Sequence, residues 1–319
     1  MPWRLGDGPP GKGTLDAVTT LALTRVDPAG FATRRDTIAA LDAAARAIDG
    51  HDALGEAVWL DLEAPGPDSV GFLIDGRAYI HVMRHGTHWA AGTVRMPDAR
   101  DRATTATLLD AAVAHVANHG GGLLACWVFG ATDADDASFG AAGMVAAREL
   151  FEMRVPLPRA EEPRWPPGVR VRTFEPGRDD AEWLGVNNRA FAEHPDQGGW
   201  TEATLRQRMA EPWFDPTLFL LATDSDGIAG FDWCKVHAPR DPDPALGEIY
   251  VIGVDPRAQG TGLGRALVIA GLAALHARGP NTGMLFCAAD NTGALALYRS
   301  IGFETHRTDR AYACEVAPR

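Results

Sequence analysis

The stretch that decides the fold is EIYVIGVDPRAQGTGLGRAL, residues 248–267. It begins as a β-strand that ends at Val254-Asp-Pro256, and a glycine-rich turn over residues 259–264 leads directly into a helix. Glycines in such a turn let successive backbone N–H groups converge without obstruction by Cβ atoms, and the helix start adds the positive end of its dipole. The stretch therefore predicts a cradle for a pyrophosphate group.

Two other glycine-rich sites do not match this spacing. A dinucleotide-binding turn has the spacing GxGxxG and an acidic residue about 20 positions later. Here the glycines follow GxGxG, and that acidic partner is missing. A nucleoside-triphosphate loop ends in Lys-Ser or Lys-Thr, which is also absent. A tight strand-to-helix turn that binds nothing remains an alternative.

Strands and helices alternate on both sides of this stretch. Strands are predicted over residues 169–174, 218–223, 228–237, 284–287 and 311–316, and helices over residues 179–191, 263–278 and 292–300. Residues 224–227 read Asp-Ser-Asp-Gly, which indicates a hairpin between two of the strands. A hairpin followed by helices favours an α+β domain with a mixed sheet over a doubly wound fold.

The length and one proline-rich segment divide the chain in two. A chain of 319 residues corresponds to about two domains of average size. Residues 156–168 contain five prolines, which indicates a stiff linker. We therefore expect domains over residues 1–158 and 159–319. In the first of them, strands are predicted over residues 77–81 and 90–94, and a helix over residues 105–117.

Composition and charge exclude several classes of protein. The chain is 46% hydrophobic and 23% charged, with no apolar run near the roughly 20 residues of a membrane span. Its net charge of −12 argues against binding to nucleic acids or anionic membranes. The four cysteines form no CxxC motif, so no zinc ribbon or disulfide framework is predicted. We expect a cytoplasmic protein.

Three histidines raise the question of a metal site. His81, His85 and His88 fall on a predicted hairpin, and nothing nearby supplies further ligands. We expect them to have other roles, and the site described below needs no metal.

Two spaced motifs carry a family resemblance. The first is Val254-x-Pro-x-x-Gln259-x-x-Gly262-x-Gly264, and the second is Asn291-x-x-Ala294-x-x-x-Tyr298 followed by Gly302-Phe303. In this order they resemble the acetyl-CoA signatures of the GCN5-related N-acetyltransferases. The resemblance implies that acetyl-CoA is the acyl donor and that the following residues bind it: Ile252, Gly253, Val254, Gln259, Gly260, Thr261, Gly262, Leu263, Gly264, Arg265, Asn291 and Ala294.

Transfer of an acetyl group to an amine needs a base for the nucleophile and an acid for the departing thiolate. Glu248 precedes Tyr250 and Ile252 by two and four residues, so we expect all three on one face of the strand, with Glu248 as the base. Tyr298, on the helix beside the thiol, is the expected acid. An exposed carboxylate and a packing tyrosine are the alternatives for these two residues.

The first half shows the same landmarks at an offset of 159 residues. Opposite Gly262, Gly264, Tyr298 and Gly302 stand Ala103, Thr105, Phe139 and Gly143. Cβ atoms at the first two positions obstruct a cradle, and phenylalanine has no phenolic proton to donate. The N-terminal domain is therefore predicted to keep the fold without the acetyltransferase chemistry. Loss of acetyl-CoA binding is a second expectation, which the sequence leaves open.

Nearly the whole chain resembles the tandem members of this family that make mycothiol by acetylating the cysteine amine of a cysteinyl-glucosaminyl-inositol. The likeness is strongest over residues 186–191, 194–200, 213–216, 233–237 and 246–250, with weaker segments at 47–58 and 151–157. It implies substrate contacts at Glu56, Asp196, Lys235, Glu248 and Phe286. Those members have glutamate where Asp196 stands and often tyrosine near Phe286.

Lys235 is notable because the chain has only one other lysine, Lys12. Surface positions are the alternatives for Lys235 and Glu56. Two other functions stay open: acetylation of another amine, such as an aminoglycoside or a peptide N-terminus, and sensing of acyl-CoA without catalysis. A sensor is expected to lack the base and the acid, whereas Glu248 and Tyr298 are both present. We expect a monomer, because two internal domains can imitate a dimer.

Overall fold

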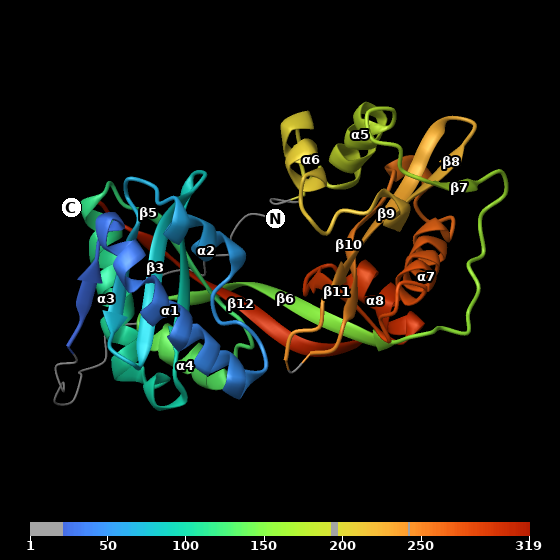
Figure 1. Ribbon diagram of the computed structural model, residues 1–319. Coiled ribbons are helices and arrows are strands. Elements are labelled where there is room, and N and C mark those ends of the chain that lie inside the picture. Colours follow the sequence, from blue (N-terminus) through green and yellow to red (C-terminus); the bar gives the residue numbers. More distant parts are fainter. Residues whose placement is uncertain (1–21, 193–196, 242) are drawn as a thin grey trace. The chain divides into compact units, whose positions relative to one another are not determined.

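The computed structural model describes residues 22–192, 197–241 and 243–319. Their contacts define two units, which are treated separately here (Figure 1). The N-terminal unit runs to Phe151 and also contains residues 288–290 and 307–319. The C-terminal unit contains residues 152–287 and 291–306.

The N-terminal unit is built from a sheet and four helices among the described residues. Its elements are β1 (Thr24–Val26), α1 (Pro28–Asp49), α2 (Glu56–Glu63), β2 (Val70–Ile74), β3 (Ala78–His85), β4 (His88–Arg95), η1 (Pro97–Ala99), α3 (Arg102–Asn118), β5 (Gly122–Val128), α4 (Asp133–Ala141) and the first part of β6 (Val145–Pro156). One apolar cluster joins the sheet to α1 and α2, and another joins it to α3 and α4. Helices thus cover both faces of the sheet (Figure 1).

The C-terminal unit repeats this plan. After the end of β6 come β7 (Arg170–Thr173), α5 (Asp180–Ala190), α6 (Glu202–Met209), η2 (Pro216–Leu218), β8 (Phe219–Asp224), β9 (Gly227–His237), β10 (Leu246–Val254), η3 (Pro256–Ala258), α7 (Leu263–His276), β11 (Thr282–Ala288), α8 (Thr292–Ile301) and β12 (Glu304–Val316). From β11 outward the strand order is β11-β10-β9-β8-β7. The predicted mixed α+β fold is confirmed, since β10 pairs in parallel with β11 and antiparallel with β9.

The two faces of the C-terminal sheet differ in what packs on them. On one face, which we call the α5 face, Trp183 of α5 meets the rings of Phe219, Phe231 and Trp233. On the opposite face, the α7 face, Leu263 and Leu267 of α7 pack on small residues of β8 and β9. This division decides where each side chain of β9 and β10 points.

The last strand belongs to the N-terminal unit over most of its length. Residues 310–316 of β12 pair antiparallel with residues 122–128 of β5. The expected domain over residues 159–319 included this strand, because a local pattern shows that a strand exists without showing its partner. The division of the sequence near the linker stays a prediction about the repeat, whereas the contact-defined unit differs from it at residues 307–319.

Most predicted elements of the second half are confirmed within a few residues, and residues 157–169 contain no helix or strand. In the first half the predicted hairpin and α3 are confirmed, whereas α1, α2, α4 and β5 were not predicted. No helix in the described residues combines the length and apolarity that crossing a membrane requires.

Candidate active site

The glycine cradle, residues 259–265, has the geometry of an anion site. Gly260 and Gly262 have φ angles of 76° and 88°, in the left-handed region that favours glycine. Gly262 is the N-cap of α7, and no side chain caps that helix. A Cβ added at either glycine meets no atom within 4 Å. The first N–H groups of α7 therefore face open space, as a bound phosphate requires.

Side chains of the cradle are engaged locally. Gln259 Nε2 donates to the carbonyl of Val254, and Thr261 Oγ1 donates to that of Ala258. The Arg265 guanidinium binds the Glu161 carboxylate at 2.6 and 2.8 Å. It is therefore the backbone of the cradle, rather than these side chains, that is free to bind an anion in this structure.

Strands β10 and β11 separate next to the cradle. Among the described residues they pair at two positions, Gly247 with Gly283 and Glu248 with Met284. Beyond Glu248, β10 continues for six residues to Val254, still paired with β9 but not with β11. Within the part of the chain that the structure describes, residues 249–254 therefore have no strand partner on the side that faces β11. An extended chain can add main-chain hydrogen bonds along such an edge, which includes residues 252–254 of the predicted acetyl-CoA site.

A β-bulge changes which residues of β10 share a face. The register against β9 shifts between Ile249 and Val251, which places Tyr250 in the bulge. Glu248 and Tyr250 lie on the α5 face, as expected, but Ile252 packs against the α7 cluster. The expectation that Ile252 shares the face of Glu248 is therefore wrong, because one extra residue reverses the alternation.

Glu248 lies beside two basic side chains on the α5 face. Its Cα is opposite Lys235 of β9, and its Oε2 lies 2.6 Å from His237 Nε2. The Glu248 side chain is 9% exposed, and that of His237 is 35% exposed. Lys235 Nζ lies 4.6 Å from the ring centroid of Trp213 and 5.7 Å from that of Tyr250. A carboxylate, an ammonium and an imidazole thus gather where β10 and β11 begin to part.

Sequence reasoning missed His237 and Trp213. His237 lies two residues after Lys235, so strand alternation places both on one face. That signal was available. The contact with Glu248 was not, because it depends on the register between β9 and β10.

Tyr298 is buried on the helix that packs beside α7. Its ring meets Phe303 edge-on, with centroids 5.8 Å apart. Burial, with smaller contributions from Cys287 and Asp232, raises the pKa of the phenol above its ordinary value. The hydroxyl therefore keeps its proton throughout the neutral range, which suits a proton donor.

Asp232 is a second buried carboxyl group, on the α7 face of β9. Its side chain is fully buried; Oδ1 accepts a hydrogen bond from Cys234 Sγ, and Oδ2 has no hydrogen-bond partner among the described residues. A Cβ on Gly271 of α7 would collide with Oδ2, so this glycine makes room for the carboxyl. Burial raises the pKa of Asp232 well above its ordinary value.

The remaining predicted residues occupy varied positions. Asn291 caps α8, where its side-chain oxygen accepts from the N–H of Ala294 at 3.1 Å. Phe286 on β11 is 40% exposed. Glu56 is exposed at the start of α2 in the N-terminal unit. Asp196 lies outside the described residues. The roles predicted for these four residues stay predictions.

The N-terminal unit has a closed helix start where the C-terminal unit has its cradle. The short helices η1 and η3 begin at Pro97 and Pro256, which agrees with the offset of 159 residues. The N-caps that follow are Asp101 and Gly262, which are 161 residues apart. The expected pairing of Gly262 with Ala103 is therefore wrong, because the N-terminal loop is two residues shorter.

Asp101 itself fills the anion position. Its Oδ1 accepts a hydrogen bond of 2.8 Å from the Thr104 N–H at the start of α3. Burial raises the pKa of Asp101, but hydrogen bonds from the Thr104 N–H and hydroxyl outweigh it and lower the pKa overall. A negative carboxylate thus binds the N–H groups that a phosphate would need, which supports the predicted loss of acetyl-CoA binding.

The base is also absent from the equivalent strands. Arg95 pairs with Ala78 two residues before Pro97, as Val254 pairs with Gly230 two residues before Pro256. When the two hairpins are aligned strand pair by strand pair from these positions, Met83 corresponds to Lys235, His85 to His237 and Ala90 to Glu248. The β3–β4 register has no bulge, and β4 pairs with β5 at four positions, Trp89 to Gly92. The N-terminal unit therefore lacks both the carboxylate and the early splay.

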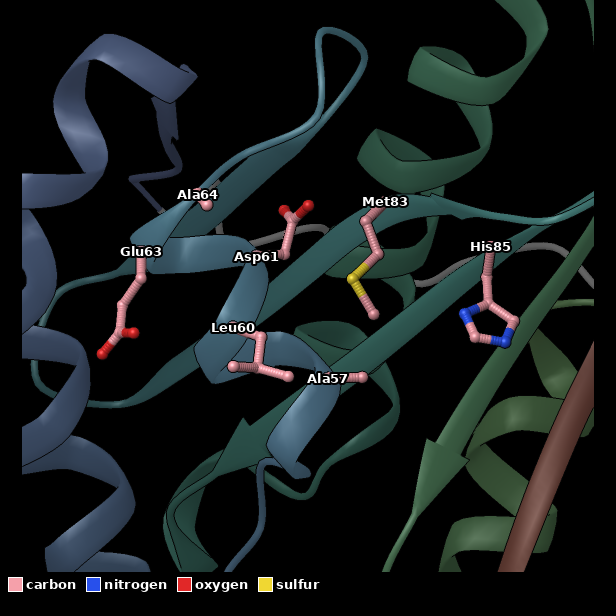
Figure 2. A pocket seen from close by; sticks show the side chains of 7 residues that line it. All are labelled: Ala57, Leu60, Asp61, Glu63, Ala64, Met83 and His85. Carbon is pink, nitrogen blue, oxygen red and sulfur yellow. The ribbon is translucent and has the colours of Figure 1, made fainter. Parts of the chain in front are cut away.

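A pocket of about 420 Å³ lies beside these residues in the N-terminal unit (Figure 2). Met83 and His85 of β3 line it together with four residues of α2 and Ala64, which follows that helix (Figure 2). Its two carboxylates are already engaged, because Glu63 pairs with Arg35 and Asp61 accepts from His81 and from the Gly66 N–H. It therefore offers no free charged group for an amine.

The three histidines of the hairpin are dispersed. His81 is buried between Tyr79 and Asp61, with ring-nitrogen contacts of 2.8 and 2.7 Å. His85 and His88 flank the predicted turn and meet each other edge-on. Within residues 22–192, 197–241 and 243–319, no group of three or more His, Cys, Asp or Glu side chains is placed to hold a metal.

Comparison with known proteins agrees with this geometry. Residues 184–303 match the model of the Acetyltransferase (GNAT) family. A mycothiol acetyltransferase of Thermobispora bispora is 42% identical over 284 residues, covering 87% of this chain and 95% of that protein. A mycothiol acetyltransferase of Mycobacterium marinum is 40% identical over 301 residues, covering 85% of this chain and 90% of that protein.

Solved structures show the same fold along the whole chain. A GCN5-related N-acetyltransferase from Sphaerobacter thermophilus superposes with a TM-score of 0.73 at 23% identity, covering 95% of this chain and 98% of that one. A tandem GNAT protein from the clavulanic acid biosynthesis pathway reaches 0.68 at 17% identity, covering 93% and 100%. These two structures show the fold, and the family model and the curated relatives show that the chain belongs to the mycothiol acetyltransferase family of GCN5-related N-acetyltransferases.

Proposed function

We propose that this acetyltransferase moves the acetyl group of acetyl-CoA to the cysteine amine of a cysteinyl-glucosaminyl-inositol, giving mycothiol. The proposed enzyme is a cytoplasmic monomer with one active site, in the C-terminal unit. The curated relatives named mycothiol acetyltransferase support the substrate, and the placement of Glu248 supports the chemistry.

One observation carries the proposal. Glu248 is a nearly buried carboxylate at the last residue where β10 pairs with β11, on the strand that leads into the glycine cradle. When the pyrophosphate of acetyl-CoA lies on the cradle and its pantetheine arm follows the free edge of β10, the thioester lies beside Glu248. The acyl carbon and the base then come together at the opening between the strands.

The donor side uses the backbone. The first N–H groups of α7 bind the pyrophosphate, and the predicted contacts at residues 252–254 follow the pantetheine arm. A free N–H on this edge donates to the thioester oxygen as it becomes the oxyanion, which is the interaction that lowers the barrier for acyl transfer. Asn291 contributes by holding the start of α8, the helix that carries Tyr298.

The proton balance assigns one role to each face of the sheet. The substrate ammonium loses one proton to Glu248, directly or through a water, and the neutral amine attacks the acyl carbon. The tetrahedral intermediate loses a second amine proton to water as the C–S bond breaks, and the thiolate takes a proton from Tyr298. Glu248 then releases its proton to solvent and Tyr298 regains one from solvent, which restores both groups. Products are an amide, CoA with a free thiol, and one proton released to solvent. Glu248 serves the α5 face, and Tyr298 reaches sulfur from the side of α7 and α8.

The polyol acceptor is proposed to bind on the α5 face. Lys235 donates to hydroxyl or carbonyl oxygens, and its stem is held over the rings of Trp213 and Tyr250. Phe286 offers an exposed ring on the neighbouring strand. Asp196 and Glu56 keep their predicted roles as acceptors for the ammonium or hydroxyl groups, and both are part of the proposal.

The experiment is acetyl transfer from acetyl-CoA to the cysteinyl pseudodisaccharide, read by mass spectrometry. We expect one added acetyl group on nitrogen and one free CoA thiol for each turnover. An aminoglycoside and a peptide N-terminus are the comparison acceptors. Turnover on one of these with none on the pseudodisaccharide contradicts the substrate and keeps the enzyme class, whereas acetyl-CoA binding without turnover on any amine indicates a sensor.

Variants test the two chemical groups. Tyr298→Phe removes the proton donor and is expected to lower kcat at least about 100-fold, with unchanged binding of CoA. Tyr312→Phe is the matched control, because it removes a buried phenolic hydroxyl of the N-terminal unit and is expected to leave kcat unchanged. Glu248→Gln is expected to lower kcat at pH 7 and to lose less activity at high pH, where the free amine is abundant. Wild-type kcat in Tyr298→Phe contradicts its role as the acid.

A further inference from the structure

His237 is the closest partner of the proposed base. It is the last residue of β9, and its Nε2 lies 2.6 Å from Glu248 Oε2. An ionised carboxylate only accepts hydrogen bonds, so Nε2 must carry the hydrogen. The two side chains differ in exposure: that of Glu248 is 9% exposed, and that of His237 is 35% exposed. The imidazole thus connects a nearly buried carboxylate with the solvent.

The other charged side chains around this pair have different partners or distances. Lys235 projects from the same face of β9, but its ammonium lies over the Trp213 and Tyr250 rings. On α5, Arg189 pairs with Asp255. On β11, the residue opposite Glu248 is Met284, which has no charge. Asp232 and Cys234 belong to the α7 face. Among the described residues, the side chain of Glu248 has its hydrogen-bond contact with His237.

We propose that His237 is the positioning residue of Glu248, and that its neutral form is the one that supports catalysis. With one ring proton, on Nε2, the imidazole holds Oε2 and leaves Oε1 to take the amine proton. A second ring proton converts the contact into a salt bridge, which stabilises the ionised carboxylate and makes it a weaker base. This inference rests on the proposed role of Glu248.

The side chain of His237 contributes little to holding the fold together. Among the residues that the structure describes, its ring joins none of the aromatic contacts of the α5 face. Its strand is held by backbone pairing with Leu246, which does not depend on the side chain. In the N-terminal unit the equivalent His85 pairs with His88 and meets its ring edge-on, and Ala90 stands at the position of Glu248. We therefore expect substitution of His237 to act on the chemistry rather than on the fold.

Two variants separate the hydrogen bond from the charge. His237→Gln keeps an N–H donor near the place of Nε2 but cannot gain a proton, whereas His237→Ala removes both. We expect His237→Ala to lower kcat about 10- to 100-fold, the usual effect of losing a residue that orients a site group. The KM for acetyl-CoA is expected to stay the same. His237→Gln should keep most of kcat at pH 8.

The pH profile decides the proposal. The wild type is expected to lose activity as the pH falls and the imidazole takes up its second proton. In His237→Gln the acid limb of kcat should move to lower pH. His276→Gln is the matched control, since this histidine of α7 binds the Pro280 carbonyl, and its acid limb should equal that of the wild type. Coincident acid limbs for His237→Gln and wild type overturn the inference, as does wild-type kcat in His237→Ala.

A measurement without turnover separates this inference from the proposed function. In the wild type, NMR should detect an imidazole Nε2–H proton that is shifted downfield by its hydrogen bond, and Glu248→Gln should alter it. Absence of this resonance from the wild type overturns the contact whatever the substrate is. The kinetic variants are assayed on whichever amine the wild type acetylates, so failure on the pseudodisaccharide contradicts only the proposed substrate.

Discussion

Gly262 offers a direct test of the cradle. Its φ of 88° lies in the left-handed region, and it is the N-cap of α7 without a side-chain cap. Alanine at this position adds a Cβ to the concave side of the cradle and forces a non-glycine residue into that region. A Cβ meets no protein atom within 4 Å, so the change creates no clash in the free protein. The cost to folding is therefore backbone strain alone.

The two effects of Gly262→Ala have different sizes. A left-handed alanine costs about 1–2 kcal/mol of stability, and each kcal/mol lowers the melting temperature of a domain of this size by about 2–4 °C. In the complex, the Cβ displaces the pyrophosphate from the N–H groups of α7. A hydrogen bond to a charged group contributes about 1.5–3 kcal/mol, so loss of one weakens acetyl-CoA binding about 10- to 100-fold.

Gly177→Ala is the matched control. Gly177 lies in the same unit, its φ is 80°, and a Cβ there also meets nothing within 4 Å. Both variants should show a similar loss of melting temperature in thermal unfolding. Isothermal titration calorimetry with acetyl-CoA should show weaker binding for Gly262→Ala alone. Equal affinities for the two variants would refute the assignment of residues 259–265 as the pyrophosphate site.

Three further predictions concern other parts of the molecule. The pKa of Asp232 is raised in the folded protein. Between about pH 4 and this raised pKa, the unfolded chain has lost a proton that the folded chain still holds. The free energy of unfolding therefore falls with rising pH, by up to about 1.4 kcal/mol per pH unit. In urea unfolding from pH 4 to pH 8, the stability of Asp232→Asn minus that of the wild type should therefore rise with pH; a constant difference contradicts the raised pKa. Lys235→Met, which copies the equivalent residue of the N-terminal unit, should raise the KM for the amine about tenfold with an unchanged KM for acetyl-CoA, and equal effects on both constants argue against an acceptor-binding role. Calorimetry should give one acetyl-CoA per chain in the wild type, and Asp101→Ala should destabilise the protein by about 1 kcal/mol without adding a second site; two sites in the wild type contradict the closed N-terminal cradle.

The local parts of the site could be predicted from the sequence. Gly260 and Gly262 are needed because the turn has positive φ angles, and that requirement is met within a few residues of chain. Glu248 and Tyr298 were found through the chemistry of acyl transfer and the spacing of the two motifs. The structure places Glu248 at the opening between β10 and β11 and buries Tyr298 on α8.

Two of the errors come from counting along the chain. The bulge at Tyr250 turns Ile252 to the other face, since strand alternation fails where one residue is extra. The N-terminal loop lacks two residues, which moves the N-cap from the expected position to Asp101. Neither change has a strong signal in a single sequence, because each depends on how a strand or loop fits its neighbours.

The sequence by itself determined the chemistry that is possible: a glycine turn that binds an anion, a carboxylate ahead of it, a phenol beyond it, and a first half without these groups. These follow from backbone freedom and side-chain type, which are properties of short stretches. Tertiary structure decided which groups meet. The pairing of β9 with β10 brings His237 to Glu248, the parting of β10 from β11 opens the free edge, and β12 completes the sheet of the other unit. These features depend on hydrogen bonds between strands distant in sequence, and local patterns do not specify their register.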